Sequence, residues 1–487
     1  MSRPALPRER AADQFFSGRL RALQNNLSAP VDISFLVFFR IIFSAAILWT
    51  AADLLSNDTI PADYIRPLFR FSYHCFSWVK PWPGSGMYVH VAGLGVLAIC
   101  VGVGFLYRLS ATLLFLGFTY IFLLEKALYL NHYYLMCLLS FVMIILPAHR
   151  RLSIDSFLRP SLRTDFVAAW TMWLLRFHIA LPYFFGGIAK LKADWLRGQP
   201  MLSWLSIAPL RFLVGPWVEQ PWVAVALSWG GVVFDLSIVP LLLWRRTQKV
   251  AFCFAVAFHL ANAFLFNIGV FPWLMIAATL VFFPPDWPRR LLRLKPPVAI
   301  LMLAPSRSLP TGQRFLRAAL LIYLLCHLLI PFRHLLYPGN VLWTEEGHTF
   351  AWNMMLRTKV TGIQVIVAKT KSRSVEYVDV MRWLTARQFE EMTHDPEMMR
   401  EFAHFVRKQY REAGKGDVEV HVVALCSLNG RKPQLLLDPT VDLASQPRTF
   451  RHKPWIVPLA EPFRRDPWNV PLAEWQKHVD LLPPTTE

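Results

Sequence analysis

Charged residues and cysteines are both scarce in this chain of 487 amino acids. Asp, Glu, Lys and Arg make up 17 % of the sequence, whereas soluble globular proteins are nearer about 25 %, so an ordinary water-soluble domain is excluded. The six cysteines are scattered without a C-x-x-C pair or a zinc-type spacing, so the sequence predicts no disulfide framework. The C-terminal third also lacks a nucleophile elbow, a P-loop and a dinucleotide fingerprint, and it therefore belongs to none of those enzyme classes.

Apolar sequence is abundant instead. Hydrophobic residues make up 55 % of the chain and lie in long blocks, and the mean hydropathy is +0.36. A perpendicular membrane helix needs roughly 20 apolar residues, so several of the blocks must tilt or pack inside a bundle. The sequence predicts an α-helical polytopic membrane protein with about nine transmembrane helices, near residues 33–55, 88–106, 109–128, 131–147, 168–189, 222–244, 250–267, 269–284 and 315–331.

The net charge of +19 comes from arginines that flank the apolar blocks. They do not line one face, so the positive-inside rule explains them better than a nucleic-acid partner does. With nine spans, every basic cluster falls on the side of the N-terminus, which is then cytoplasmic, and the first block is expected to be retained. The clusters are the arginines of residues 1–21, Arg108, Arg150, Arg151, Arg159, Arg163, Arg245, Arg246, Lys249 and the basic residues of 289–317.

This topology divides the chain into a cytoplasmic segment (1–32), a helical membrane domain (33–335) and an extracytoplasmic α/β domain (336–487). In the last domain, residues 360–367 and 375–380 read as strands, and Asp395-Pro396 as a helix start. Residues 418–428 and 434–437 read as a hairpin around Asn429-Gly430.

Polar residues within or beside the apolar blocks are the candidate functional groups, because each costs roughly 2.5–3.5 kcal/mol to insert into a bilayer. Lys190 either snorkels to the outer interface or acts as a base in an apolar pocket, where the charged amine is disfavoured. Arg176 and Asp235 are predicted to form a structural ion pair between helices. His259 and Asn262 share one helix face and either join helices by hydrogen bonds or bind a ligand.

Asn131 and His132 open another apolar block, where His132 is either an interfacial histidine or a ligand-binding group. If these polar groups converge on a pocket in the outer half of the bundle, they suit an oxygen-bearing, lipophilic ligand such as a membrane quinol. The histidines lie on separate segments without ligand spacing, so no metal site is expected.

A set of motifs in one order resembles the vitamin K-dependent gamma-carboxylase family, whose membrane domain is called HTTM. The resemblance runs from about residue 33 to 460. The motifs are YRLS (107–110), YIFLLEK (120–126), NHYYL (131–135), GIAKLKADW (187–195), DLS (235–237), FHLAN (258–262), WNMM (352–355), SLNGR (427–431) and DPTVD (438–442).

The resemblance implies that Lys190 deprotonates vitamin K hydroquinone, a reduced menaquinone or phylloquinone. The anion then reacts with O₂ on the way to the epoxide, and the strong base so formed allows CO₂ to add to a glutamate of a protein or peptide substrate. Such a base requires a site without bulk water. No metal is implied. The residues expected to bind the quinol are Asn131, His132, His259, Asn262, Trp352, Met354 and Met355.

The chain departs from the animal pattern in three ways. Ala189 stands where the animal enzymes have the first of two adjacent lysines, and Lys192 replaces an acidic residue. The chain also ends soon after the DPTVD motif, as in a compact, bacterial-type relative whose last domain is periplasmic. The alternative function is a non-catalytic membrane protein that binds or transports a quinone or lipid, although no two-fold sequence repeat supports transport.

Overall fold

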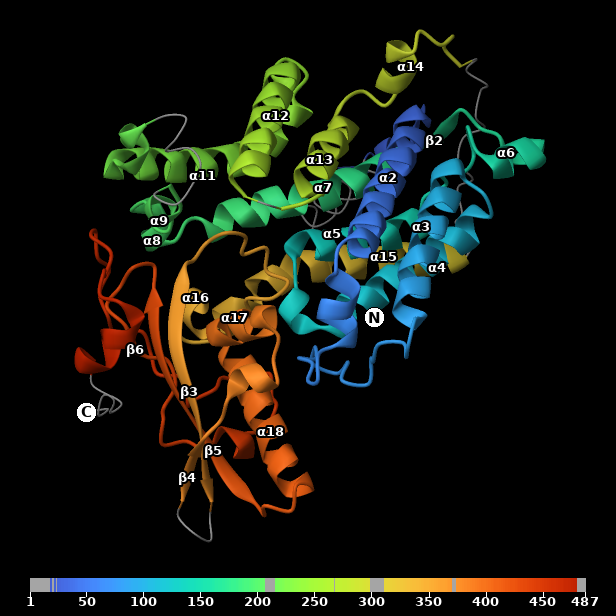
Figure 1. Cartoon of the computed structure of the whole chain (residues 1–487). Coiled ribbons are helices and arrows are strands. Elements are labelled where there is room, and N and C mark those ends of the chain that lie inside the picture. The colour runs from blue at the N-terminus through green and yellow to red at the C-terminus, as the bar shows by residue number, and fades with distance from the viewer. Residues whose placement is uncertain are drawn as a thin grey trace, which may run out of the picture.

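The computed structural model describes residues 18–479 with gaps at 20–21, 23, 206–214, 267, 298–310 and 370–373. Most of the predicted cytoplasmic segment 1–32, with Arg3, Arg8, Arg10 and Arg21, lies outside the described residues, as does Arg307. The described chain forms a helical bundle followed by a region with a small sheet (Figure 1).

Seven helices of the described residues are long and apolar enough to cross a membrane, which identifies the chain as an integral membrane protein. Six of them are α2 (Ser34–Ser56), α3 (Gly86–Val103), α4 (Tyr107–Leu124), α7 (Trp170–Ala189), α11 (Pro221–Leu243) and α12 (Gln248–Leu265). The seventh candidate span, Ala318–Leu336, runs from within α15 (Thr311–Leu329) to the end of the short helix that follows it. The other two predicted spans are also helices, but α5 (Asn131–Ile145) and α13 (Phe271–Ala278) are short. The count of nine spans therefore stays a prediction.

Neighbouring helices pack in chain order for the most part. Helix α3 lies between α2 and α4, α5 packs on α4 and α7, and α11 packs on α7 and α12. Helix α13 returns to α2 and closes the bundle. The short strands β1 (Pro30–Asp32) and β2 (Phe166–Ala168) pair antiparallel and tie the start of α2 to the start of α7.

Short elements connect these helices. They are η1 (Ile60–Ile65), η2 (Lys126–Leu128), α6 (Ile154–Leu158), η3 (Pro160–Leu162), α8 (Ala193–Leu196), α9 (Met201–Leu205), η4 (Pro216–Glu219), η5 (Thr279–Phe282), α14 (Trp287–Leu291), η6 (Ile330–Leu336) and α16 (Val341–Thr344).

The C-terminal region is built on a four-stranded antiparallel sheet in the order β4-β3-β5-β6. Its long central pair, β3 (Lys359–Lys369) and β5 (Val418–Leu428), is fully in register from Lys359 opposite Leu428 to Lys369 opposite Val418. The edges are β4 (Val375–Tyr377) and β6 (Gln434–Leu435). Helices α17 (Ala386–His394) and α18 (Pro396–Glu412) pack on β3 and β5, respectively. The short helix η7 (Val380–Arg382) precedes α17, and η8 (Leu443–Ser445) and η9 (Leu472–Lys477) follow β6.

The predicted local signals in this region are confirmed. The Asp395 side chain accepts a hydrogen bond from the Glu397 amide and so caps α18, with Pro396 at the first helical position. Asn429 and Gly430 both adopt positive φ, +52° and +73°, as the turn after β5 requires. The second predicted strand ends earlier than expected, at Tyr377.

The bundle and the C-terminal region share one buried apolar cluster. Phe71, Trp195 and Val232 of the membrane part belong to the same cluster as Val365 and Phe402 of the C-terminal part. The two parts therefore do not pack as separate globules, and the contacts between them include the segments that follow α2, α4 and α7. Those loops carry two of the sequence motifs.

Candidate active site

Helix α7 ends at the lysine that the sequence singles out. Two glycines let it approach α11 closely: a Cβ at Gly187 would lie 2.6 Å from Cδ2 of Leu236 and 3.1 Å from Cβ of Asp235. A Cβ at Gly186 would lie 3.4 Å from Oδ2 of Asp235. The glycine pair thus brings the Asp235 side chain to the last turn of α7, where Lys190 is the C-terminal cap.

Lys190 donates a hydrogen bond to Oδ2 of Asp235 and forms a buried ion pair with it. The side chains are only 10 % and 5 % exposed. Nζ of Lys190 lies 5.4 Å from the ring centroid of Trp195 and 6.0 Å from that of Phe258. The lysine therefore does not snorkel to water: it sits in an apolar, aromatic enclosure with one carboxylate partner.

The predicted Arg176–Asp235 ion pair is wrong. Arg176 donates instead to three carbonyl oxygens at the end of η5, those of Val281, Phe282 and Phe283, at 3.0–3.2 Å. It precedes Lys190 by 14 residues, about 21 Å along a helix, and so lies near the opposite end of α7. A helix end leaves its last carbonyls without intrahelical donors, and a buried guanidinium can satisfy them.

A hydrogen bond between His259 and Tyr183 joins α12 to the half of α7 that ends at Lys190. The Tyr183 hydroxyl and Nε2 of His259 are hydrogen-bonded at 2.6 Å. Phe258, the residue before His259, reaches the Lys190 ammonium. Asn262, in contrast, donates to the Phe258 carbonyl of its own helix at 2.8 Å. The structure thus brings His259 to the neighbourhood of Lys190 and engages the Asn262 amide locally.

His132 and His259 meet at one aromatic ring. The His132 ring stacks on Phe271 with centroids 5.6 Å apart, and the His259 ring meets Phe271 edge-on at 6.3 Å. Asn131 points elsewhere: its Oδ1 accepts from the Tyr129 hydroxyl at 3.0 Å. Two of the four polar residues expected to bind the quinol therefore flank a common ring, although α5 and α12 are far apart in the chain.

The WNMM motif lies in a strained loop over these helices. Phe350, Trp352 and Met355 have φ of +65°, +58° and +51°, a conformation that costs roughly 1–3 kcal/mol each and is typical of functional sites. Trp352 is buried against Tyr134, and Met354 reaches α7, where its Cε would lie 3.2 Å from a Cβ at position 186. Met355 is exposed.

Asn353 is a residue that sequence reasoning left out. Its side chain is buried, and its Oδ1 has no hydrogen-bond partner among the described residues. A buried acceptor without a donor is costly unless a ligand or water supplies one. The signal was available in the motif itself, since asparagine is the one strongly polar residue of WNMM.

A second ion pair holds the loop that carries Lys190. The Arg431 guanidinium donates two hydrogen bonds to Asp194, at 2.6 and 2.7 Å, and Asn429 donates a third at 2.9 Å. Burial alone raises the pKa of the Asp194 carboxyl, but these hydrogen bonds and the arginine charge outweigh it and hold the pKa below its usual value. The SLNGR motif thus clamps the GIAKLKADW motif.

The YIFLLEK motif makes another contact between the bundle and the C-terminal region. Lys126 pairs with Asp395 at 2.5 Å, directly at the start of α18. Glu125 accepts from the Phe71 and Ala127 amides and from the Gln388 side chain. Burial nevertheless raises the pKa of Glu125 to about 7. Both motifs that flank the membrane boundary therefore hold the two parts of the chain together.

In the described part of the chain, no three His, Cys, Asp or Glu side chains lie close enough together to bind a metal ion. The Lys190 ammonium contacts a hydrogen-bonded carboxylate and two aromatic rings, and His132 and His259 flank Phe271 on neighbouring helices. Such a set suits an apolar ligand with polar oxygen atoms and a proton to lose.

Known protein families match nearly all of the described chain. The HTTM domain matches residues 28–287, and the vitamin K-dependent gamma-carboxylase lumenal domain matches residues 312–462. No solved structure matches the chain. The lumenal match indicates that the C-terminal region is extracytoplasmic and that the protein is an enzyme of gamma-carboxylase type, with vitamin K and a glutamate-containing substrate. With these two domains in this order, the chain belongs to the vitamin K-dependent gamma-carboxylase family.

Proposed function

We propose that this protein oxygenates vitamin K hydroquinone dissolved in the membrane to the epoxide, and that Lys190 is the base that removes the quinol proton. The buried contact between Lys190 and Asp235 is the observation that carries the proposal. A lysine held away from water, against aromatic rings, at the end of a membrane helix is costly and is explained by chemistry at that position.

In the proposed scheme, one proton moves within this ion pair, between the Lys190 amine and the Asp235 carboxyl. When it lies on the Asp235 carboxyl, Lys190 is a neutral amine and can accept the proton of a quinol hydroxyl. Asp235 is a positioning residue in this scheme: it orients the amine and stores the proton between turnovers.

Loss of the quinol proton gives an electron-rich anion that can react with O₂. Epoxide formation from that anion supplies a base strong enough to take a γ-proton from a glutamate side chain, to which CO₂ then adds. Bulk water would protonate such a base, so the protein must exclude water from the reacting groups. The strained loop around Trp352 and the clamp between Asp194 and Arg431 supply this closure from the C-terminal side.

Quinol binding is assigned to the groups that converge near Phe271 and the strained loop. His132 and His259 flank Phe271 and can hydrogen-bond the two ring oxygens of a quinol. Asn353 supplies an unpartnered acceptor for a hydroxyl. Trp352 and Met354 supply apolar contact. Asn131, Asn262 and Met355 contribute less, because they bond locally or face outward.

The proposal is tested with wild-type protein in nanodiscs. Vitamin K hydroquinone and O₂ should give the epoxide, and addition of a glutamyl peptide with labelled CO₂ should give labelled product in proportion to epoxide. Omission of O₂ should stop both reactions. Bound quinone without epoxide would contradict the proposal and would favour the binding or transport function. Epoxide without label would restrict the function to quinol oxygenation.

A further inference from the structure

A cavity lies outside the Lys190 site, at another part of the bundle. It has a volume of about 880 Å³ and lies between α2, α3 and the loop that leads into α6. The C-terminal region contacts the other end of α2, through the segment that includes Phe69 and Ser72. Figure 1 shows α6 and the C-terminal sheet on opposite sides of the molecule. The cavity is therefore separate from the proposed active site.

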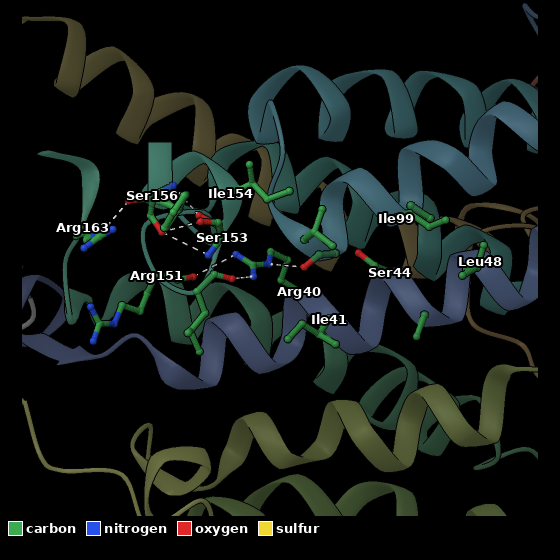
Figure 2. Close-up of a pocket in the computed structure, with 16 residues that line it drawn as sticks. Arg40, Ile41, Ser44, Leu48, Ile99, Arg151, Ser153, Ile154, Ser156 and Arg163 are labelled. Atoms are coloured by element: carbon green, nitrogen blue, oxygen red, sulfur yellow. Dashed lines mark hydrogen bonds between the residues drawn. The ribbon is translucent and has the colours of Figure 1, made fainter. Parts of the chain in front are cut away.

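One end of the cavity is apolar and open. Ile41, Leu48 and Ile99 line it from two adjacent helices (Figure 2), and they are 50 %, 38 % and 51 % exposed. Both helices are apolar enough to span a membrane, so this groove faces acyl chains. Its walls fit a hydrocarbon chain that lies along the helices.

The other end is cationic. Arg40, Arg151 and Arg163 line it, and no acidic residue does so among the described residues. Arg40 is buried, and its guanidinium donates to main-chain carbonyls, including those of Gly102, Ala148 and Leu152. These hydrogen bonds all go to carbonyl groups, and Asp155 is the carboxylate whose charge acts on Arg40 from nearby.

The other two arginines have more freedom. Arg151 shares Asp165 with Arg289, at 3.2 and 3.0 Å, and the Arg163 guanidinium donates to the Ser156 carbonyl. Both line the cavity, so an anion at its mouth would lie beside their charges. The positive charge at this end therefore exceeds what the neighbouring carboxylates can balance.

A polar group also lies between the two ends. Ser44 is only 4 % exposed, and its Oγ has no hydrogen-bond partner in the described structure although it lines the cavity. Phe157 on α6, 73 % exposed, stands beside the opening. Exposed aromatic and basic side chains side by side are typical of the headgroup layer of a bilayer.

We propose that this cavity binds one anionic glycerophospholipid. Its phosphate lies between Arg151 and Arg163, an ester oxygen accepts a hydrogen bond from the Ser44 hydroxyl, and one acyl chain fills the groove between α2 and α3. A soluble phosphate compound would satisfy the arginines but would leave Ile41 and Ile99 without a partner. The apolar groove and the cationic end together select a lipid.

The test measures lipid binding to the purified full-length protein by native mass spectrometry. Dioleoyl phosphatidylglycerol should bind more tightly than dioleoyl phosphatidylcholine. Replacing both arginines, R151Q with R163Q, should weaken phosphatidylglycerol binding at least about tenfold, because each basic group near an anionic headgroup contributes on the order of 1 kcal/mol. Arg159→Gln is the matched control: it is exposed in the same loop but does not line the cavity, and it should leave binding within about twofold.

A second pair of variants tests the acyl groove without changing charge. Ile99→Trp should fill the groove and lower the bound lipid, whereas Val96→Trp, on an exposed face of the same helix outside the cavity, should not. Equal loss in the Arg159→Gln control would overturn the proposal in favour of general surface charge. Equal affinity for phosphatidylcholine would also overturn it, and so would displacement of the lipid by inorganic phosphate.

Discussion

Loss of Arg431 should loosen the loop that carries Lys190, although the two residues belong to different parts of the fold. In the Asp194–Arg431 pair the side chains are 8 % and 7 % exposed, and Arg431 is held by both oxygens of the carboxylate. Removing one partner of a buried pair costs roughly 3–5 kcal/mol, because the other charge stays buried. Asn429 still donates to Asp194 in Arg431→Ala, so we expect about 3 kcal/mol.

Hydrogen exchange measures this loss locally. About 3 kcal/mol corresponds to roughly a hundredfold faster exchange of the amides in residues 190–199, at about 1.4 kcal/mol for each factor of ten. Arg431→Lys keeps the positive charge but not the two parallel donors of the guanidinium. Its exchange rate should therefore lie between those of the wild type and Arg431→Ala. Arg465→Ala removes an exposed arginine of the same region and should leave exchange unchanged.

The pH dependence of the clamp has a defined sign. Because the pKa of Asp194 is lower in the folded protein than in the unfolded chain, the clamp stabilises the fold above about pH 4 and is lost as the pH falls further. The reasoning would be refuted if Arg431→Ala exchanged no faster than Arg465→Ala. The loop would then be held by its apolar contacts alone.

Three further predictions concern the same machinery. Gly187→Ala places a methyl carbon 2.6 Å from a leucine of α11 and should lower stability by about 1–3 kcal/mol in thermal unfolding, whereas Gly230→Ala, with open space around it, should be neutral. Burial raises the pKa of Glu125 to about 7, so the folded protein retains a proton that the unfolded chain loses. Stability should then fall by up to ~3 kcal/mol as the pH rises from about 4.5 to about 7, and a denaturation series should show Glu125→Gln without that slope. Asp235→Asn leaves the Lys190 amine without its orienting carboxylate, and should lower turnover about a hundredfold while quinone binding, measured separately, is kept.

Local signals in the sequence were sufficient for much of the fold. Apolar block lengths gave the positions of the membrane helices, and the cap at Asp395 and the turn at Asn429-Gly430 depend on residues within a few positions. Lys190 was identified because a charged residue at the end of an apolar block is costly wherever the chain goes. These features need no knowledge of tertiary contacts.

The pairing of charges could not be predicted in the same way. Arg176 and Asp235 were matched because both are charged and lie in apolar blocks, but nothing in the sequence gave their depths along α7 and α11. Asp194 and Arg431 are 237 residues apart, and Lys126 and Asp395 are 269 apart. Partners at such separations are set by how the C-terminal region docks on the bundle, which local pattern does not encode.

The central claim is that Lys190 acts as the base, and a comparison of two lysine variants tests it most directly. Lys190→Ala and Lys192→Ala remove the same group two residues apart, but only Lys190 contacts Asp235. In nanodiscs loaded with equal bound vitamin K hydroquinone, Lys190→Ala should form epoxide about 10²–10⁴-fold more slowly than wild type, the range for loss of a general base. Lys192→Ala should retain most of the activity. Epoxide formed by Lys190→Ala at the wild-type rate would contradict the account.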